Sequence, residues 1–553
     1  MLFRSQTQLW KFNLRSLPEV HFTCNFALKE RFRNIDILFW TGFLLLLCAL
    51  MSNLVLFLGQ QQYKLKKNIT FITLGANRVY LFIRYILSLM IPILISYLLA
   101  LAILELVYPL FNDFTAIGSG ANSVKSGIIQ RMEFGALLTE SAKYTGIYLA
   151  VYLLLALIPI IHFIRRSTGR SRNNSSVFIR RILIAGQIFV GSLFLISSIS
   201  MYKQLSFMNN APKGMELSHI MQVYLGFNTS ANTDLELIKT RLLQLSEVED
   251  VTLTEGPLLM SDGMFNTLNL LRVDGRDIEK AYMENDYENY FYVQENFFDF
   301  FGIKFVEGRS FANEEKNTFV INEAGVKKIG LDNLLQRTTN NGAGKIAGII
   351  SDYHYSPMRY PIQAVVFELL DKRFYNYQYI YIKTAQKDIS RIEEIISEYD
   401  TGEVSKEESI VLLKDIEDGF NRPDTTIFII FVAFALLCIL ISSFGIYSLV
   451  ALSAEQRKKE IAIRKINGAM FVDILRLFLK EYFVLVMIGN LFALPAGYFF
   501  INRWLESYAY RTVIGFVLFL LVLFITCSIV ILSVARQVKS ASSVNAAESI
   551  KCE

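Results

Sequence analysis

The chain has 553 residues, of which 53% are hydrophobic, and a mean hydropathy of +0.37, so its composition excludes an ordinary soluble protein. The stretch 202–424 carries a net charge of about −13, whereas the remainder carries about +18. Such a division is typical of a membrane protein with an acidic extracytoplasmic domain and basic cytoplasmic loops, so the basic excess indicates membrane topology and contact with anionic lipid headgroups rather than nucleic-acid binding.

The N-terminal part begins with residues 1–36, which contain no apolar core of a cleavable signal peptide. The first uncharged run, Ile37 to about Leu58, is long enough to cross a ~30 Å hydrocarbon core as a helix. Both of its flanks are basic, so charge alone does not orient it. Further runs at Tyr85–Leu104 and Tyr144–Ile164 complete a predicted three-span domain over 37–164.

The stretch 165–181 has six arginines, no acidic residue and a middle rich in Ser, Asn and Gly, which predicts a flexible cytoplasmic linker. A basic run of this kind can bind anionic lipid, but a determinant of membrane orientation is the simpler interpretation. A fourth span, 182–201, then leads across the membrane to the acidic stretch.

The acidic stretch 202–424 alternates β-rich runs with helical patterns, so we expect an α+β extracytoplasmic domain. Helical patterns cover Asp234–Ser246 and Asp388–Tyr399. The β-rich runs are Met221–Leu225, Val251–Leu253, Tyr290–Val293, Thr318–Ile321, Lys345–Ile350, Val365–Leu369 and Tyr379–Ile382.

Two features of this domain resemble catalytic motifs, and neither is complete. Asp352 and His354 lie two residues apart without a nucleophile or metal ligand at a suitable spacing, so a structural turn after a strand is the favoured interpretation. Asn341–Lys345 lacks the frame of a phosphate-binding loop, because Ile346 stands where Ser or Thr would bind Mg²⁺. The five cysteines and four histidines form no metal-binding pattern. The sequence therefore predicts no catalytic residue, metal or cofactor in this chain.

The C-terminal part contains three more uncharged runs, at Thr425–Ala454, Tyr482–Asn502 and about Thr512–Ala535. They predict a second three-span domain over 425–535, followed by a cytoplasmic tail at 536–553. The predicted fold class is therefore a polytopic α-helical membrane protein with about seven spans and an α+β extracytoplasmic domain.

Between the first two of these runs lies a stretch that we call the charged segment, Ala454–Asp473. Glu455 and Lys459, like Glu460 and Arg464, are four residues apart in the favourable order for a helix. We expect Gly468 to end that helix as its C′ residue, and the basic residues place the segment on the cytoplasmic face. A charged helix in this position need be no more than a topological anchor, and composition leaves that alternative open.

The residues GIYSLVALSAEQRKKEIAIRKINGA resemble the signature of MacB/FtsX-type ABC transporter permeases, in which an E-x-R-x-x-E-I-x-I-R-K-x-x-G-A run follows a transmembrane helix. In that family the run is a short helix that lies along the inner membrane surface and docks onto the partner ATPase. Phrases within Glu295–Phe311, Phe319–Gly330 and Ile346–Arg359 resemble the family's periplasmic core domain. The residues that match the signature, and that the resemblance assigns to ATPase coupling, are Glu455, Arg457, Glu460, Ile461, Ile463, Arg464, Lys465, Gly468 and Ala469.

An earlier stretch, QQQYKLKKNITFITLGANRVY, resembles a degenerate copy of this signature that retains Lys66, Leu74, Gly75 and Ala76. The resemblance places residues 60–78 inside the cell and the N-terminus outside. Related two-repeat permeases carry an additional first span and first external domain. By this resemblance the present chain lacks both, and we expect residues 1–36 to be a remnant of that external domain. A missed upstream start, a gene remnant and a genuinely short variant all fit this pattern.

The resemblance implies a permease subunit of the bacterial inner membrane, not itself an enzyme, that couples ATP hydrolysis by a separate ABC ATPase to movement of the extracytoplasmic domain. Efflux, for example of antimicrobial peptides, and mechanotransmission both fit this expectation. The expected partners are the ATPase, membrane lipid, a second permease in a dimer, and a periplasmic adaptor or exported substrate. The alternative is a membrane sensor or scaffold whose external domain binds a ligand or partner without driven transport.

Overall fold

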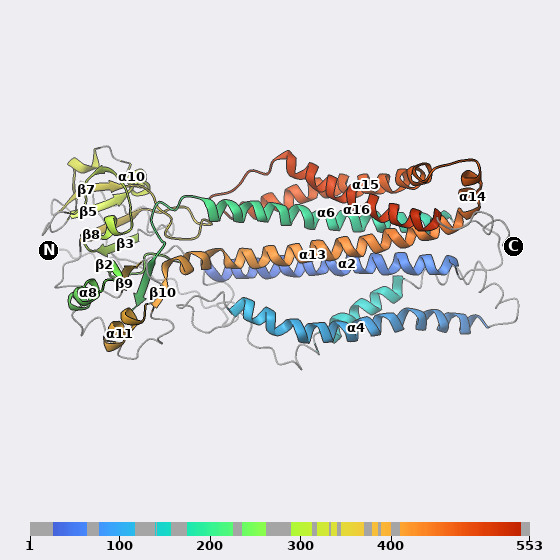
Figure 1. Ribbon diagram of the computed structural model, residues 1–553, viewed down its shortest axis with the longest axis horizontal. Helices are drawn as coiled ribbons and strands as arrows, with labels where there is room; N and C mark the ends of the chain where they lie inside the picture. Colours follow the sequence, from blue (N-terminus) through green and yellow to red (C-terminus); the bar gives the residue numbers. More distant parts are fainter. Residues whose placement is uncertain are drawn as a thin grey trace, which may run out of the picture.

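The protein combines a bundle of long apolar helices with a separate sheet domain (Figure 1). Among the described residues, six helices are long and apolar enough to cross a membrane, and the strands form one ten-stranded sheet. The predicted combination of membrane-spanning helices with an α+β domain is confirmed. The computed structural model describes residues 26–63, 77–116, 139, 141–155, 174–224, 235–260, 289–311, 318–330, 333–339, 344–369, 379–384, 389–399 and 410–542.

The six membrane-crossing helices follow the predicted uncharged runs, because a helix satisfies its backbone hydrogen bonds within one segment, as a bilayer requires. Residues 141–155 are also helical, and the rest of the expected third span, 156–164, lies outside the described residues. The six helices are α2 (Phe26–Tyr63), α4 (Arg78–Ala116), α6 (Asn174–Asn210), α13 (Leu413–Gln456), α15 (Phe471–Leu505) and α16 (Phe516–Ser542).

Several helices extend beyond the predicted boundaries. The prediction of a flexible linker is wrong from Asn174 onward, because α6 already begins there. Arg180 is buried in the bundle and Arg181 forms an ion pair with Glu481 of α15, so tertiary contacts order a stretch that composition alone marks as solvated. Helix α2 likewise begins at Phe26, inside the segment expected to be a remnant, whose residues 1–25 lie outside the described part.

Helix α6 occupies the centre of the bundle, where it packs against α2, α13, α15 and α16. Small residues on α15 allow the closest approach, since a Cβ atom added to Gly489 would lie 2.8 Å from Cγ2 of Ile188. Polar side chains also join the helices: the Ser192 hydroxyl donates to Asn490 Oδ1 at 3.0 Å, and Asn490 Nδ2 donates to Thr526 Oγ1 at 3.2 Å.

Charged residues mark where this bundle leaves the hydrocarbon. The helix α6 is uncharged between Arg181 and Lys203, and α15 is uncharged between Glu481 and Arg503, lengths of about 30 Å that match the core of a bilayer. Because Arg181 contacts Glu481, these residues define one boundary. Lys203 and Arg503 define the other, which lies on the side of the sheet domain.

The sheet has the strand order β10-β1-β9-β2-β3-β8-β5-β7-β4, with β6 paired to β7. It is mixed, because β3 pairs with β8 and β5 pairs with β7 in parallel, whereas the other pairs are antiparallel. The strands are β1 (Ile220–Tyr224), β2 (Val248–Thr254), β3 (Asn289–Val293), β4 (Phe305–Gly308), β5 (Thr318–Asn322), β6 (Thr338–Thr339), β7 (Gly344–Ile350), β8 (Val365–Leu369), β9 (Tyr379–Thr384) and β10 (Ile410–Leu412).

Seven of these strands coincide with predicted β-rich runs, and β4, β6 and β10 do not. Both β4 and β10 are edge strands whose residues are mostly exposed or half-buried, so they lack the apolar pattern that marks an inner strand. Helices α8 (Leu235–Leu243) and α11 (Ser390–Tyr399) cover one face. The other face packs around α9 (Phe297–Phe300), whose Phe297 and Phe298 contact Phe367 of β8.

Asp352 and His354 lie in the turn after β7, as the structural interpretation predicted. Asp352 Oδ1 accepts hydrogen bonds from Asn322 Nδ2 and from the backbone N–H of Ala324, both at 2.9 Å, at the start of α10 (Glu323–Ile329). The ring of His354 instead packs edge-on against Tyr510 of the α15–α16 loop. The side chains of Asp352 and His354 therefore contact different parts of the protein.

Candidate functional site

The charged segment folds into two helices rather than the single helix that was predicted. Helix α13 ends at Gln456, Arg457 leaves helical geometry with ψ of 13°, and α14 runs from Lys458 to Ile466. The reason for the break is that the Arg457 side chain turns into the bundle. Its Nη2 lies 3.4 Å from Glu481 Oε2, and its Cζ lies 5.8 Å from the centroid of the Phe478 ring.

Glu481 joins three parts of the chain at this point. It forms ion pairs with Arg181 of α6 and with Arg457 at the α13–α14 junction, while itself lying on α15. This arrangement fixes the start of α14 relative to the bundle. Arg457 therefore makes contacts within the chain, and its assignment to ATPase coupling, which the resemblance implies, stays a prediction.

The end of α14 confirms the predicted role of Gly468. This residue has φ of +86°, and its N–H donates to the Lys465 carbonyl at 3.1 Å. The Ala469 N–H donates to the Arg464 carbonyl at 2.9 Å, which completes a Schellman motif. The Asp473 carboxylate then accepts a hydrogen bond from the Met470 N–H at 2.9 Å at the start of α15, so both ends of the turn are capped.

The signature residues divide into an inward and an outward group. Ile461 is buried with Ala462 against the bundle, in a cluster that includes Ala454, Ile474 and Phe478. Ala469 is half-buried. The exposed residues are Glu455, Glu460, Ile463, Arg464, Lys465 and Gly468.

The exposed side of α14 and of the turn after it is apolar as well as charged. Ile463, Ile466, Met470 and Val472 are 54%, 63%, 73% and 55% exposed, and we call these four residues the α14 patch. Glu460 and Arg464 border the patch and form an ion pair at 2.8 Å. Sequence reasoning missed Ile466, Met470 and Val472. A signal was present in the sequence, because α14 has apolar residues on two sides of the helix and only one of these sides packs against the bundle.

The first copy of the signature cannot be compared in the same way. Lys66, Leu74, Gly75 and Ala76 lie outside the described residues. The chain is described again from Asn77, whose Oδ1 accepts a hydrogen bond from the Val79 N–H at 3.1 Å at the start of α4.

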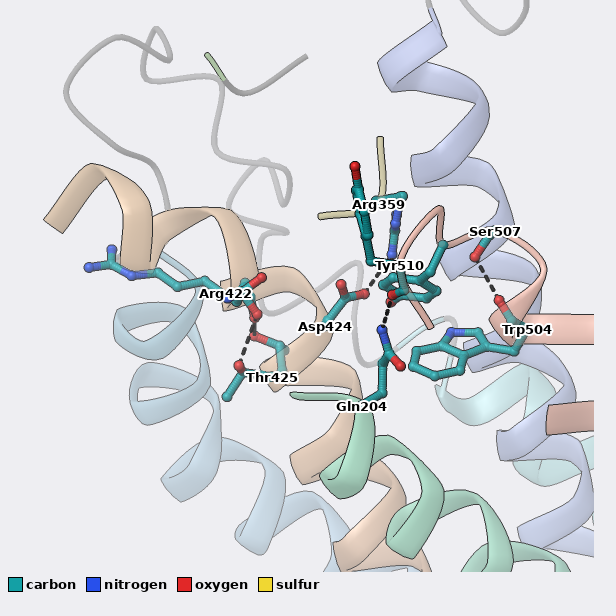
Figure 2. A network of polar contacts seen from close by, with 11 residues as sticks. Gln204, Arg359, Arg422, Asp424, Thr425, Trp504, Ser507 and Tyr510 are labelled. Atoms are coloured by element: carbon teal, nitrogen blue, oxygen red, sulfur yellow. Dashed lines mark hydrogen bonds and ion pairs between the residues drawn. The ribbon is translucent and has the colours of Figure 1, made fainter. Parts of the chain in front are cut away.

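At the opposite end of the bundle, the loop between β7 and β8 binds the helices (Figure 2). Arg359 Nη2 lies 2.7 Å from Asp424 Oδ1 of α13 and donates to the Tyr508 hydroxyl at 2.9 Å. The Arg359 guanidinium also stacks over the Tyr508 ring, 4.8 Å from its centroid. The side chains of Arg359 and Asp424 are only 10% and 8% exposed, so this is a buried ion pair.

Backbone hydrogen bonds reinforce this contact. The Ala509 N–H donates to the Arg359 carbonyl at 3.0 Å. Gln204 of α6 donates from Nε2 to the Tyr510 carbonyl at 2.9 Å and accepts from the Thr512 N–H at 2.9 Å. We call this region the sheet–bundle junction: Arg359, Asp424, Tyr508, Tyr510, Thr512 and Gln204.

The described residues offer no cluster of three or more His, Cys, Asp or Glu side chains that is placed to hold a metal ion. The structure has the exposed helix α14 at one end of the bundle, and at the other end the sheet domain is bonded to the helices through the sheet–bundle junction.

Comparison with known proteins finds similarity over parts of this chain. The FtsX-like permease C-terminal family matches residues 432–545, which include α14 and parts of α13, α15 and α16. The macrolide export ATP-binding/permease protein MacB of Bdellovibrio bacteriovorus is 31% identical over 85 residues, or 15% of this chain and 13% of that protein. An ABC transporter permease of Methanocaldococcus jannaschii is 31% identical over 125 residues, or 22% of this chain and 34% of that protein.

The chain is therefore similar to MacB/FtsX-like ABC permeases. Its matches to these two curated relatives span 13% and 34% of their lengths. Among solved structures, the periplasmic region of MacB from Actinobacillus actinomycetemcomitans aligns with 38% of this chain and 96% of that chain, at 16% identity and a TM-score of 0.27. This chain is a multi-pass membrane protein, and the part that matches the FtsX-like family contains the charged segment.

Proposed function

We propose that this permease couples ATP hydrolysis on a separate ABC ATPase, bound at the α14 patch, to movement of the sheet domain on the other side of the membrane. The observation that carries the proposal is α13, one continuous helix of 44 residues from Leu413 to Gln456. At 1.5 Å per residue it is about 66 Å long. Strand β10 directly precedes it and α14 follows its end, so a displacement at α14 reaches the sheet along one helix.

The chemistry of the α14 patch supports a protein partner. The four exposed apolar side chains of the patch lie on α14, in the turn after it and in the first turn of α15. They are bordered by Glu455, Glu460, Arg464 and Lys465. An apolar centre with a charged rim is the usual composition of a protein interface. The ion pairs of Glu481 support the patch from inside, so a force applied there acts on α6, α13 and α15 together.

In this proposal α14 and the basic stretch 165–181 face the cytoplasm, and the acidic sheet domain is extracytoplasmic. The membrane is the bacterial inner membrane, and the division into two three-span domains, 37–164 and 425–535, follows the two copies of the signature. Movement of the sheet domain would serve efflux, including efflux of antimicrobial peptides, or mechanotransmission. A second permease, a periplasmic adaptor and an exported substrate complete the proposed set of partners.

A second candidate is a sensor or scaffold without driven transport. It is favoured by the degenerate first copy, which lacks charged equivalents of Glu455 and Arg457. In that case the charged segment is a topological anchor and binds no ATPase. The two candidates differ in what a mutation of the exposed ion pair does.

The test exchanges the charges of that pair in the variant Glu460→Arg/Arg464→Glu. Both side chains are 45% exposed, and the internal pair is worth only about 0.2–0.5 kcal/mol, so membrane levels should stay normal. Like charges against the partner can cost several kcal/mol. We therefore expect loss of co-purification of an ABC ATPase, identified by mass spectrometry, and loss of ATP-dependent function.

The matched control is Arg503→Glu/Glu506→Arg, an exposed pair at the opposite boundary of the bundle with 3.6 Å between its charged atoms. This variant should retain the ATPase. If both variants retain the ATPase, the charged segment does not bind it, and the interpretation as a topological anchor holds.

A further inference from the structure

A cavity of about 650 Å³ opens between the bundle and the sheet domain, at the end of α6. Its walls come from α6 and the turn after it, from the β7–β8 loop and from the α15–α16 loop. The apolar walls are formed chiefly by Phe207, Met358 and Tyr510, and the polar groups include Lys203, Asn210 and His354. The volume is in the range of pockets that hold a small organic ligand.

The cavity lies at the level of the lipid headgroups. Lys203 is the first charged residue of α6 after the uncharged run that begins beyond Arg181, so it marks the boundary of the hydrocarbon on the sheet side. Ser206, Phe207 and Asn210 follow within two helical turns, or about 10 Å. The headgroup of a phospholipid in the adjoining leaflet would therefore lie level with the cavity.

The charge of the cavity is positive. Lys203 Nζ donates to the Val513 carbonyl at 2.7 Å, and within the described part of the chain no carboxylate lies within ion-pair distance of it. Burial and the nearby Lys213 lower the pKa of His354 to about 4, so this side chain is neutral at pH 7. Lys213 is itself paired with Glu417 at 2.9 Å. Lys203 thus leaves the cavity with one uncompensated cation at its membrane side.

We propose that this cavity binds an anionic phospholipid from the leaflet on the sheet side, with the phosphate at Lys203 and the rest of the headgroup between Phe207, Met358 and Tyr510. The lipid enters laterally, because the cavity lies beside the end of the uncharged run of α6. An anion at a lysine gains a charge-assisted hydrogen bond, and the apolar walls contact the rest of the headgroup.

The position of the site gives the bound lipid contacts on both sides of the sheet–bundle junction. Met358 and His354 belong to the sheet domain, whereas Lys203 and Phe207 belong to α6 and Tyr510 to the α15–α16 loop. The lipid therefore bridges the same two parts that Arg359 and Asp424 join. This site does not depend on the ATPase proposal, because it uses none of the residues of α14.

The test uses the full chain in nanodiscs of phosphatidylcholine that contain a minor fraction of phosphatidylglycerol with a photoreactive headgroup. Cross-linked peptides are mapped by mass spectrometry. We expect labelling of the peptides that carry Phe207, Met358 and Tyr510, and a loss of that labelling by roughly ten- to hundredfold in Lys203→Gln, about the value of one charge-assisted contact. Photoreactive phosphatidylcholine should label these peptides weakly.

Two further variants distinguish specific binding in the cavity from non-specific electrostatic attraction of anionic lipid to the protein surface. Arg503→Gln removes a cation that lies at the same boundary but does not line the cavity. The lipid should label this variant as strongly as it labels the unmodified chain. Ala211→Trp fills the cavity without changing its charge and should lose the labelling, while an unchanged melting temperature shows that the fold is intact. Equal labelling by the two lipids, equal loss in Lys203→Gln and Arg503→Gln, or unchanged labelling in Lys203→Gln would overturn the proposal.

Discussion

Replacing Arg359 with methionine should detach the sheet domain from the bundle while leaving the helices in the membrane. The guanidinium pairs with Asp424 and covers the Tyr508 ring in a nearly dry site. Its removal leaves a buried carboxylate without its cation, which costs about 3–5 kcal/mol. We expect faster hydrogen exchange in 351–364 and 506–515, normal co-purification of the ATPase, and loss of ATP-dependent function.

The double variant Arg359→Met/Asp424→Leu is the control, because it removes both charges at once. A buried ion pair can be replaced by apolar side chains of similar volume with little loss of stability. The double variant should therefore recover most of the protection that Arg359→Met loses. If Arg359→Met exchanges like the unmodified chain, the sheet–bundle junction does not hold the sheet domain.

The second large effect is expected at Gly489 of α15. A Cβ atom there would lie 2.8 Å from Cγ2 of Ile188 and 3.0 Å from the Ala185 carbonyl oxygen of α6. A backbone atom cannot move aside without moving the helix, so Gly489→Ala should force α6 and α15 apart at a cost of about 1–3 kcal/mol. We expect a melting temperature several degrees lower, measured on detergent-solubilised protein by size-exclusion chromatography after heating.

Two other glycines provide matched controls. At Gly497 the three atoms nearest to an added Cβ would all be side-chain atoms of Ile196, the closest at 2.7 Å, and none of them is a backbone atom, so Gly497→Ala should cost less. At Gly42 of α2 nothing lies within 4 Å, and Gly42→Ala should be neutral or slightly stabilising, since alanine favours a helix. Equal melting temperatures for all three variants would contradict a close contact between α6 and α15.

The membrane spans could be predicted from the sequence because the bilayer demands long uncharged runs, and Tyr482–Asn502 accordingly lies within α15. The end of α14 was also predictable, since only a glycine readily adopts the positive φ found at Gly468. Inner strands such as β8 were found at their observed bounds because their apolar residues are contiguous. These features depend on local chemistry.

The features that sequence reasoning missed depend on residues far apart in the chain. Arg457 turns inward because Glu481 and Phe478 lie beside it in the bundle. No pattern in the sequence around Arg457 predicts that contact. Arg181 is ordered by the same glutamate, across 300 positions. The close packing at Gly489 and Gly497 left a readable signal, small residues eight positions apart on one helix face, but its partner α6 could be identified only in the fold.

The central claim, that events at α14 move the sheet domain, is tested most directly by a distance measurement across the chain. Spin labels at Leu237→Cys of α8 and Leu106→Cys of α4, both exposed, are placed in a variant whose five native cysteines are replaced by alanine. Double electron–electron resonance is recorded on the permease purified with its ATPase, without nucleotide and after trapping with ATP and vanadate. We expect the distance distribution to shift on trapping in this protein and to stay fixed when Glu460→Arg/Arg464→Glu is added. The same distribution in both nucleotide states of the intact complex would contradict the claim.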